Sequence, residues 1–257
     1  MTIFLKKHVC TLLVTSLLFN CAGVFYAAKK IYTKRMYASD KNLISDRYAS
    51  ILRYDSLPPE TEIDKTILLN TLIEKSGYTS YLEIGQGKAE DNFDHINCMI
   101  RIGVDPDSTC NAAYCLTSDE FFDLNKATFD LIFVDGLHHN EQVYRDILNA
   151  LNCLNKNGTI VVHDCNPINE GMQEVPQTQD FWTGDVWKAW ARLRSERNDL
   201  EMFVLKNGNG CGVIMAGEQK TIIIPDSLTY RYFDENRDYL LNFKTVNSFL
   251  TRLKKSN

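Results

Sequence analysis

The chain has 257 residues, of which 44% are apolar, enough for one substantial hydrophobic core. Its 28 lysines and arginines are outnumbered by 33 aspartates and glutamates, so the net charge is -5. A nucleic-acid-binding surface normally needs a basic surplus, and this balance therefore excludes nucleic acid as the expected partner. We expect one globular domain with an appended N-terminal segment.

The first 35 residues contain an apolar run from Val9 to Ala28, with two lysines before it and a denser basic cluster after it. This length can just span a bilayer, but threonine and asparagine dilute the run. A membrane anchor, a signal peptide and a buried or interfacial helix are all open interpretations. The basic cluster favours an anchor with the following domain in the cytoplasm, and export is the alternative. We divide the chain into this segment (1–35), a linker (36–60) and a globular domain (61–257).

The globular domain should begin with a helix in "TEIDKTILLNTLIEKSGY", with Thr61 as a plausible N-cap. Short apolar runs then alternate with helical patterns, which is typical of a parallel sheet covered on both faces. The runs are at 80–85, 101–105, 112–117, 129–135 and 158–164. "LEMFVLK" and "CGVIMAG", joined by "NGNG", predict an antiparallel hairpin at the sheet edge. The predicted fold is a doubly wound α/β, mainly parallel, seven-stranded sheet with this C-terminal hairpin.

The cysteines and tryptophans favour structural roles. The eight cysteines include no C-x-x-C pair, and Cys115, Cys153 and Cys211 fall in apolar stretches, where a reduced cysteine packs as a small hydrophobe. Trp187 and Trp190 are three residues apart, on one face of a predicted helix. We expect both tryptophans in the core and assign no thiol chemistry.

A glycine-containing turn follows the first predicted strand. In "YLEIGQGKAEDNF", Glu83 is followed by Gly85 and Gly87, which permit a tight turn close to a ligand. Asp105 ends the next strand, where a carboxylate can accept hydrogen bonds from ribose hydroxyls. The dinucleotide fingerprint would need glycine where Glu90 stands, and this glutamate would repel a pyrophosphate. The pattern indicates a nucleoside-containing ligand other than NAD or FAD.

This pattern, E-x-G-x-G with a later acidic residue, resembles that of class I S-adenosylmethionine-dependent methyltransferases over roughly residues 60 to 220. The resemblance implies a Rossmann-like methyltransferase fold. It also implies that Glu83 helps to hold the amino-acid end of the cofactor, usually indirectly. The usual third glycine is Ala89 here. "TSDEFF" resembles the segment that lines the adenine pocket, which makes Ser118 and Asp119 candidates, with a helix N-cap role as the alternative.

Two further stretches, "FVDGLHHNEQVYRDI" and "GTIVVHDCNP", resemble the macrocin and mycinamicin group of sugar O-methyltransferases. The resemblance implies that Asp135 binds a metal and also belongs to the cofactor-binding residues, and that His138 is the base. The acidic pair that completes the metal site in this group reads His163-Asp164 here. The histidine weakens the case for magnesium or favours manganese, iron or zinc, unless His163 points away. The expected metal ligands are Asp135, His163 and Asp164, with Mg or Mn as the expected ion.

The gathered residues suit methyl transfer to oxygen. A hydroxyl attacks the methyl group of a sulfonium in line, helped by a base and by a divalent ion that polarises its oxygen. We expect an S-adenosylmethionine-dependent O-methyltransferase acting on a small-molecule or glycan hydroxyl. The alternatives are a nucleotide-dependent oxidoreductase, disfavoured by Glu90, and an inactive membrane-tethered binding module. Asp135, His138 and Asp164 together speak against the module. The sequence does not determine the oligomeric state.

Overall fold

The computed structural model describes residues 64–253. The apolar run at 9–28 and the linker at 36–60 lie outside this range, so their predicted roles stay predictions. Within residues 64–253, the helices are too short or too polar for any of them to cross a membrane.

The centre of the domain is a six-stranded sheet with strand order β2-β1-β3-β4-β6-β5. The first four strands in this order are parallel, and β6 is antiparallel to both β4 and β5. The strands are β1 (Ser80–Ile84), β2 (Ile100–Val104), β3 (Phe129–Val134), β4 (Leu154–Val162), β5 (Leu200–Leu205) and β6 (Cys211–Ala216). The predicted mainly parallel α/β sheet and its antiparallel edge hairpin are both present.

The prediction of seven strands is wrong for the described part of the chain. Segment 112–117 forms only a single bridge, between Tyr114 and Val104 at the outer edge of the sheet. Tyr114 N–H donates to the Gly103 carbonyl at 3.1 Å, and Asp105 N–H donates to the Tyr114 carbonyl at 3.1 Å. Most side chains of the segment are exposed or half-buried, so its apolar residues do not occupy core positions.

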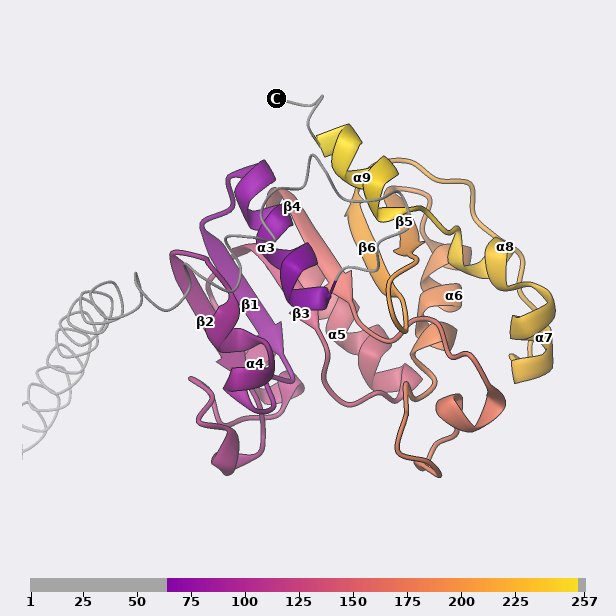
Figure 1. The fold of residues 1–257 in the computed structure, drawn as a ribbon, viewed down its shortest axis with the longest axis horizontal. Helices are drawn as coiled ribbons and strands as arrows, with labels where there is room; N and C mark the ends of the chain where they lie inside the picture. The colour runs from indigo at the N-terminus through magenta and orange to yellow at the C-terminus, as the bar shows by residue number, and fades with distance from the viewer. Residues whose placement is uncertain (1–63, 254–257) are drawn as a thin grey trace, which may run out of the picture. The chain divides into compact units, whose positions relative to one another are not determined.

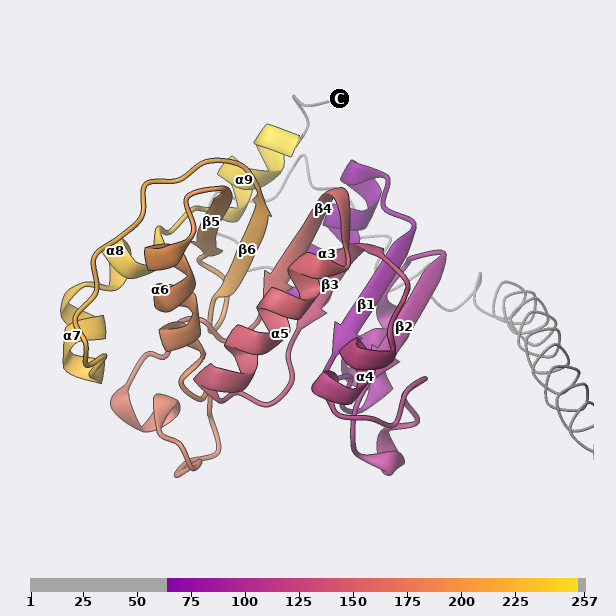
Figure 2. The ribbon, with the colours of Figure 1, turned by 180° about the vertical axis from the view of Figure 1, so that it is seen from behind.

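Helices cover both faces of the sheet, as expected for a doubly wound fold. Helices α4, α5 and α6 cover the face that is seen in Figure 2. Helices α3 and α9 lie on the opposite face, in front of the sheet in Figure 1. The helices are α3 (Lys65–Ser76), α4 (Ser118–Leu124), α5 (Asn140–Asn152), α6 (Val186–Glu196), α7 (Tyr230–Glu235), α8 (Arg237–Leu241) and α9 (Val246–Leu253).

The N-cap of α3 is Asp64 rather than Thr61. The Asp64 carboxylate accepts a hydrogen bond from the Thr66 N–H at 2.7 Å, and the helix ends at Gly77 in the left-handed conformation. This cap places Lys65 in the first turn of the helix, a position that matters for the site described below.

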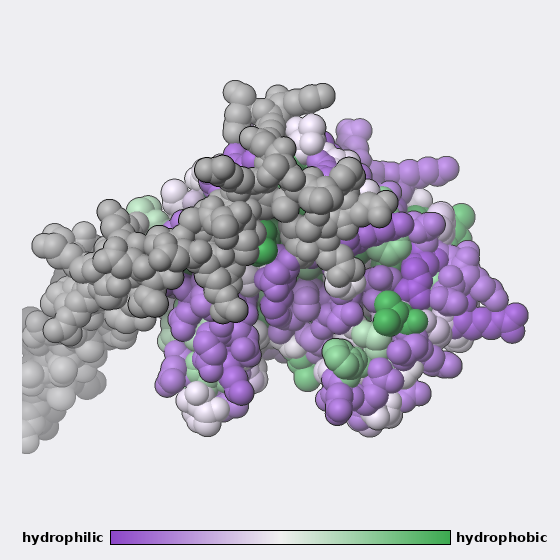
Figure 3. Space-filling view, in the orientation of Figure 1, coloured by the Kyte–Doolittle hydropathy of each residue, from purple (hydrophilic) through white to green (hydrophobic). Residues whose placement is uncertain are grey.

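The core lies between the sheet and its helices. Trp187 and Trp190 on α6 are fully buried, and Trp187 packs against Phe233, so the core interpretation of both tryptophans is confirmed. Cys153 and Cys211 are buried as predicted, whereas Cys115 is exposed and that expectation is wrong. Figure 3 shows that the coloured part of one face is mostly hydrophilic with small separate apolar patches, as expected when the large apolar side chains are inside.

The C-terminal helix is tied to the edge strand β5 through Glu201. Its carboxylate accepts hydrogen bonds from Lys244 at 2.7 Å and from Arg252 on α9. Chiefly because of the Arg252 hydrogen bonds, the pKa of Glu201 is lowered to about 2. The ionised carboxylate therefore stabilises the folded state fully above about pH 4.5, and this contribution is lost as the pH falls towards 2.

Replacing Glu201 with glutamine should lower the free energy of unfolding at pH 7 by about 1 kcal/mol, a value discounted for partial exposure. The difference from wild type should shrink between pH 4.5 and pH 2, as wild-type Glu201 becomes protonated. Urea unfolding at pH 7, 4 and 3 measures both effects. Glu235→Gln, which breaks the exposed pair with Arg231, is the control and should change nothing measurable. A constant Glu201→Gln deficit at all three pH values would contradict the prediction.

Candidate active site

The glycine turn after β1 lies against the loops that follow two neighbouring strands. Gly85 has a φ of +81°, and its N–H donates to the Val104 carbonyl at the end of β2. A Cβ on Gly85 would lie 2.3 Å from the carbonyl oxygen of Asp135, after β3. Gly87 N–H donates to Asp105 Oδ2 at 2.8 Å. The structure thus brings Gly85, Gly87 and Asp105 together and sets them directly beside Asp135.

Segment 89–95, after this turn, forms two 3-10 turns instead of the start of an α-helix, and Glu90 lies in the first of them. Since a dinucleotide-binding turn leads into a helix whose N-terminus holds the pyrophosphate, this segment departs from that motif in backbone as well as in sequence.

Glu83 is buried under the turn, with 1% of its surface exposed. Tyr81 OH donates to one carboxylate oxygen at 2.7 Å, and Asn92 Nδ2 donates to the other at 3.0 Å. Burial raises the pKa of Glu83 to about 7, although both hydrogen bonds oppose this change. Because both oxygens are already engaged, Glu83 is placed to organise the turn through Asn92 rather than to contact a ligand by itself. Sequence reasoning missed Tyr81 and Asn92, and no motif singles them out.

Ser118 and Asp119 lie in the first turn of α4, but neither is its N-cap. That role belongs to Thr117, which forms a capping box with Glu120. Gln142 on α5 donates to Ser118 Oγ at 3.0 Å and to Asp119 Oδ1 at 3.1 Å. The N-cap alternative is therefore wrong. The two side chains join α4 to α5 at the carboxyl edge of the sheet.

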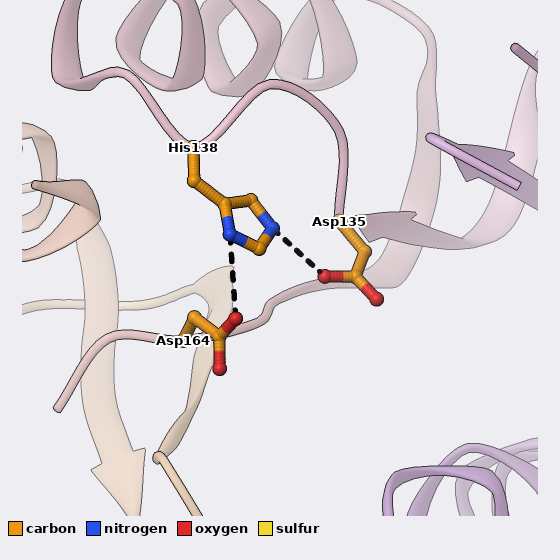
Figure 4. A group of neighbouring side chains, drawn as sticks. All are labelled: Asp135, His138 and Asp164. Atoms are coloured by element: carbon orange, nitrogen blue, oxygen red, sulfur yellow. Dashed lines mark hydrogen bonds and ion pairs between the residues drawn. The ribbon is translucent and has the colours of Figure 1, made fainter. Parts of the chain in front are cut away.

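Asp135, His138 and Asp164 meet at the carboxyl ends of β3 and β4. Figure 4 shows the His138 ring between the two carboxylates, with one ring nitrogen facing each. His138 Nε2 lies 3.2 Å from Asp135 Oδ1, and His138 Nδ1 lies 3.4 Å from Asp164 Oδ2. Asp164 is 4% exposed and has a φ of +59°, an uncommon conformation for a residue other than glycine. Such backbone strain is often found at functional sites.

His163 also lies between the two carboxylates. Its Nδ1 is 3.1 Å from Asp135 Oδ1 and 3.3 Å from Asp164 Oδ1. Burial alone would lower the pKa of His163, but the Asp135 and Asp164 carboxylates raise it well above its usual value. Burial alone would likewise raise the pKa of Asp135, but His163, His138 and Lys65 hold it well below its usual value. His163 therefore points into the site, and the alternative that it points away is wrong.

Lys65 enters the site from the first turn of α3. Its Nζ donates to Asp135 Oδ2 at 2.7 Å, across 70 residues of sequence. Burial alone would lower the pKa of Lys65, but the Asp135 carboxylate raises it. Lys65 and a protonated His163 together balance the charges of Asp135 and Asp164. Nothing in the sequence pattern distinguishes Lys65 from an ordinary helical lysine, and so sequence reasoning missed it.

The donor set fits a divalent metal ion. In the described part of the chain, Asp135, His138 and Asp164 offer ligand atoms that all lie within 4.8 Å of one another. Two of the buried polar atoms here, His138 Nδ1 and Asp164 Oδ1, make no hydrogen bond. A set that mixes imidazole with carboxylates suits manganese, iron or zinc better than magnesium. This geometric group contains His138 where the sequence resemblance implied His163.

Residues 49–165 match the model of a family described as a methyltransferase domain. A search of curated protein sequences found no match.

Several solved structures are similar to the chain. PaMTH1 of Podospora anserina, a methyltransferase with bound SAH, is 16% identical over 60% of this chain and 78% of its own, with a TM-score of 0.46. TomG of Streptomyces achromogenes, an O-methyltransferase in complex with SAM, is 13% identical over 72% of this chain and 94% of its own, with a TM-score of 0.45. MycE, a methyltransferase in complex with Mg, SAH and mycinamycin VI, is 13% identical over 61% of this chain and 50% of its own, with a TM-score of 0.39. The methyltransferase-domain match spans the segment that carries the Gly85 turn, Asp135 and Asp164, and the doubly wound sheet is the fold that the resemblance to class I S-adenosylmethionine-dependent methyltransferases implies.

Proposed function

We propose that the protein transfers the methyl group of S-adenosylmethionine to a hydroxyl of a small-molecule or glycan-linked acceptor. The observation that carries this proposal is the position of His138 between Asp135 and Asp164, next to the Gly85 turn. An imidazole oriented by two carboxylates, beside a turn suited to a nucleoside ligand, can act as a general base towards a hydroxyl within hydrogen-bond reach.

His138 is suited to the role of base because its two ring nitrogens differ in environment. Nε2 is hydrogen-bonded to Asp135 Oδ1, and Nδ1 makes no hydrogen bond. A proton on Nε2 would be held by Asp135, which leaves Nδ1 free to accept the hydroxyl proton of the acceptor. The acceptor oxygen then forms a bond to the methyl carbon, the bond from that carbon to sulfur breaks, and S-adenosylhomocysteine leaves as a neutral thioether.

A divalent cation forms part of the proposal, with Asp135 and Asp164 as its carboxylate ligands. When bound, such an ion would polarise the acceptor oxygen and lower the pKa of its hydroxyl. His163, protonated beside the two carboxylates, would have to release its proton for the ion to bind strongly. Lys65 would keep Asp135 Oδ2 engaged and leave Oδ1 facing the site.

The cofactor assignment is tested by calorimetric titration of the full-length protein with S-adenosylhomocysteine and, separately, with NAD. We expect S-adenosylhomocysteine to bind and Asp105→Ala to weaken its binding by about 1 to 3 kcal/mol, the usual cost of stranding a hydrogen-bonded partner. Asp107→Ala, in the same loop, is the control for general loop damage. Binding of NAD alone would favour the oxidoreductase, and binding of neither would favour the tethered module.

The acceptor is sought by transfer of a labelled methyl group to a panel of free sugars, glycosides and catechols. Incorporation into one of these classes identifies the acceptor chemistry. A protein that binds S-adenosylhomocysteine but methylates carbon or nitrogen, and not oxygen, would contradict the O-methyltransferase proposal.

We further propose that residues 9–28 anchor the protein with its catalytic domain in the cytoplasm. The basic cluster after the apolar run supports this orientation, and the cofactor is made inside cells. A reporter fused after residue 36 should report a cytoplasmic location. An exported reporter would overturn the localisation and weaken the enzymatic proposal, because the cofactor is scarce outside cells.

A further inference from the structure

The β4–α6 loop, residues 163–185, folds back over the loop that carries His138. Trp182 stacks on the His138 ring, with 5.4 Å between the ring centroids and 24° between the planes. It also meets His139 edge to face at 6.3 Å. The indole is itself held, because Trp182 Nε1 donates to the Glu174 carbonyl at 2.6 Å. One face of His138 is therefore covered by an aromatic ring whose own position is restrained.

The next residues of the loop hold the backbone of His138. Asp185 N–H donates to the His138 carbonyl at 3.1 Å. Gly184, with a φ of +59°, approaches so closely that an added Cβ would lie 1.9 Å from the same carbonyl oxygen. Only glycine permits this approach, because the clash would be with backbone rather than with a movable side chain.

Asp185 also caps the N-terminus of α5, in place of the helix's own N-cap residue. His139 occupies the N-cap position of α5, and its side chain makes no capping hydrogen bond. The Asp185 carboxylate instead accepts hydrogen bonds from Asn140 N–H at 2.7 Å and from Asn140 Nδ2 at 2.6 Å. A cap donated from another loop satisfies helix N–H groups and joins the two loops at the residue after His139.

The segment that ends at Asp185 is hydrogen-bonded to Met172. The Met172 carbonyl accepts hydrogen bonds from Thr183 N–H at 2.9 Å, Thr183 Oγ1 at 3.0 Å and Gly184 N–H at 3.1 Å. Met172, Thr183 and Asp185 are all buried. Such packing restrains residues 182–185, which we call the clasp, before any ligand binds.

We propose that the clasp is a positioning device for His138, with Trp182 restraining the plane of the imidazole and Asp185 restraining its backbone. Asp135 and Asp164 hold the ring by its edge, and Trp182 holds it by its face, so that rotation of the imidazole is opposed from three sides. Because the imidazole is already oriented, less free energy is needed to align it with the acceptor hydroxyl whose proton it removes. The inference rests on the proposed role of His138 as base, but the restraint itself can be measured without it.

The experiment compares full-length wild type with Trp182→Ala, Trp182→Phe and Asp185→Asn. Nitrogen-15 NMR of the His138 side chain should give two distinct ring-nitrogen shifts in wild type, as in a ring held in one tautomer, and partly averaged shifts in Trp182→Ala. Asp185→Asn should loosen the ring too. The asparagine amide has only one acceptor oxygen, so it can accept from only one of the two Asn140 donors on separate oxygens, and its NH2 group would face the other donor. Trp182→Phe keeps an aromatic face and should restore most of the wild-type spectrum.

Once an acceptor is known, Trp182→Ala should lower kcat about 10-fold to 100-fold. This is the range found when a residue that orients a metal ligand, without binding the metal itself, is removed. The KM for S-adenosylmethionine should not change. Phe181→Ala is the matched control, since Phe181 is the neighbouring aromatic, is 80% exposed and makes no ring contact with His138. It should leave both the spectrum and kcat unchanged.

Wild-type His138 shifts in both Trp182→Ala and Asp185→Asn would overturn the inference, even if the variants lost activity. Averaged shifts in a protein that methylates no acceptor would support the clasp and contradict the proposed function instead. Unfolding temperatures close to wild type would show that the variants are folded. If Trp182→Ala does not fold, the spectrum of Asp185→Asn decides: averaged His138 shifts support the clasp, and wild-type shifts overturn it.

Discussion

Replacing Asp164 with asparagine is expected to reduce methyl transfer at least about a hundredfold, within the range for loss of acid–base assistance. The carboxylate lies 3.4 Å from Nδ1 of His138 and 3.3 Å from Nδ1 of His163, so its charge acts on both imidazoles. Asparagine has nearly the same size and tolerates the left-handed backbone of this position, with its φ of +59°. Transfer of a labelled methyl group to the acceptor measures the loss.

Binding of S-adenosylhomocysteine to Asp164→Asn should be nearly unchanged, because the residues proposed to bind the cofactor, Gly87 and Asp105, pair with each other and not with Asp164. Asp164→Ala should also abolish turnover but should in addition destabilise the fold, since alanine is strained at this backbone conformation. The reverse pattern, with Asp164→Asn retaining turnover and losing S-adenosylhomocysteine binding, would mean that Asp164 contributes to cofactor binding rather than to the activation of the acceptor.

Replacing Gly85 with alanine is expected to lower the free energy of unfolding by about 2 to 4 kcal/mol, because overpacking adds to the cost of a positive φ. The new Cβ would lie 2.3 Å from both the carbonyl oxygen of Asp135 and the Cα of Gly136. Both are backbone atoms, so the β3–α5 loop must shift, and Asp135 must move with it. Thermal unfolding should show a fall in Tm of roughly 5 to 15 °C for a domain of this size.

Gly77→Ala is the matched control for Gly85→Ala. Gly77 has a similar φ of +66°, but nothing lies within 4 Å of its added Cβ. It should show only the conformational cost of about 1 kcal/mol and should leave S-adenosylhomocysteine binding intact. Equal losses of stability in the two variants would mean that contact between the glycine turn and the Asp135 loop contributes nothing.

The sequence pattern predicted the sheet well where burial and propensity agree. The predicted runs at 80–85, 101–105 and 129–135 became β1, β2 and β3 with boundaries within one residue. Segment 112–117 failed because it lies at the outer edge of the sheet, bonded only through Tyr114. An apolar run in the sequence does not show whether the segment pairs with a neighbouring strand on one side, on both sides or on neither.

The sequence also predicted the residues of the site only in part. The sequence pointed to His138 and His139 together, and the resemblance preferred the first. The structure turns His138 towards Asp135 and Asp164 and leaves His139 at the start of α5. It also turns His163 into the site, where sequence reasoning had left its direction open. Direction depends on rotamer and packing, which residue spacing does not encode.

The sequence by itself determined the parallel sheet and the gathering of Gly85, Asp105, Asp135 and Asp164 along one edge of it. The physical reason is that parallel strands joined by crossover helices must all present their carboxyl ends on the same side. Only the tertiary structure brought in Lys65, across 70 residues to Asp135, and Trp182, over the ring of His138. These contacts come from the docking of a helix and the folding of a long loop, and each depends on many distant residues packing together.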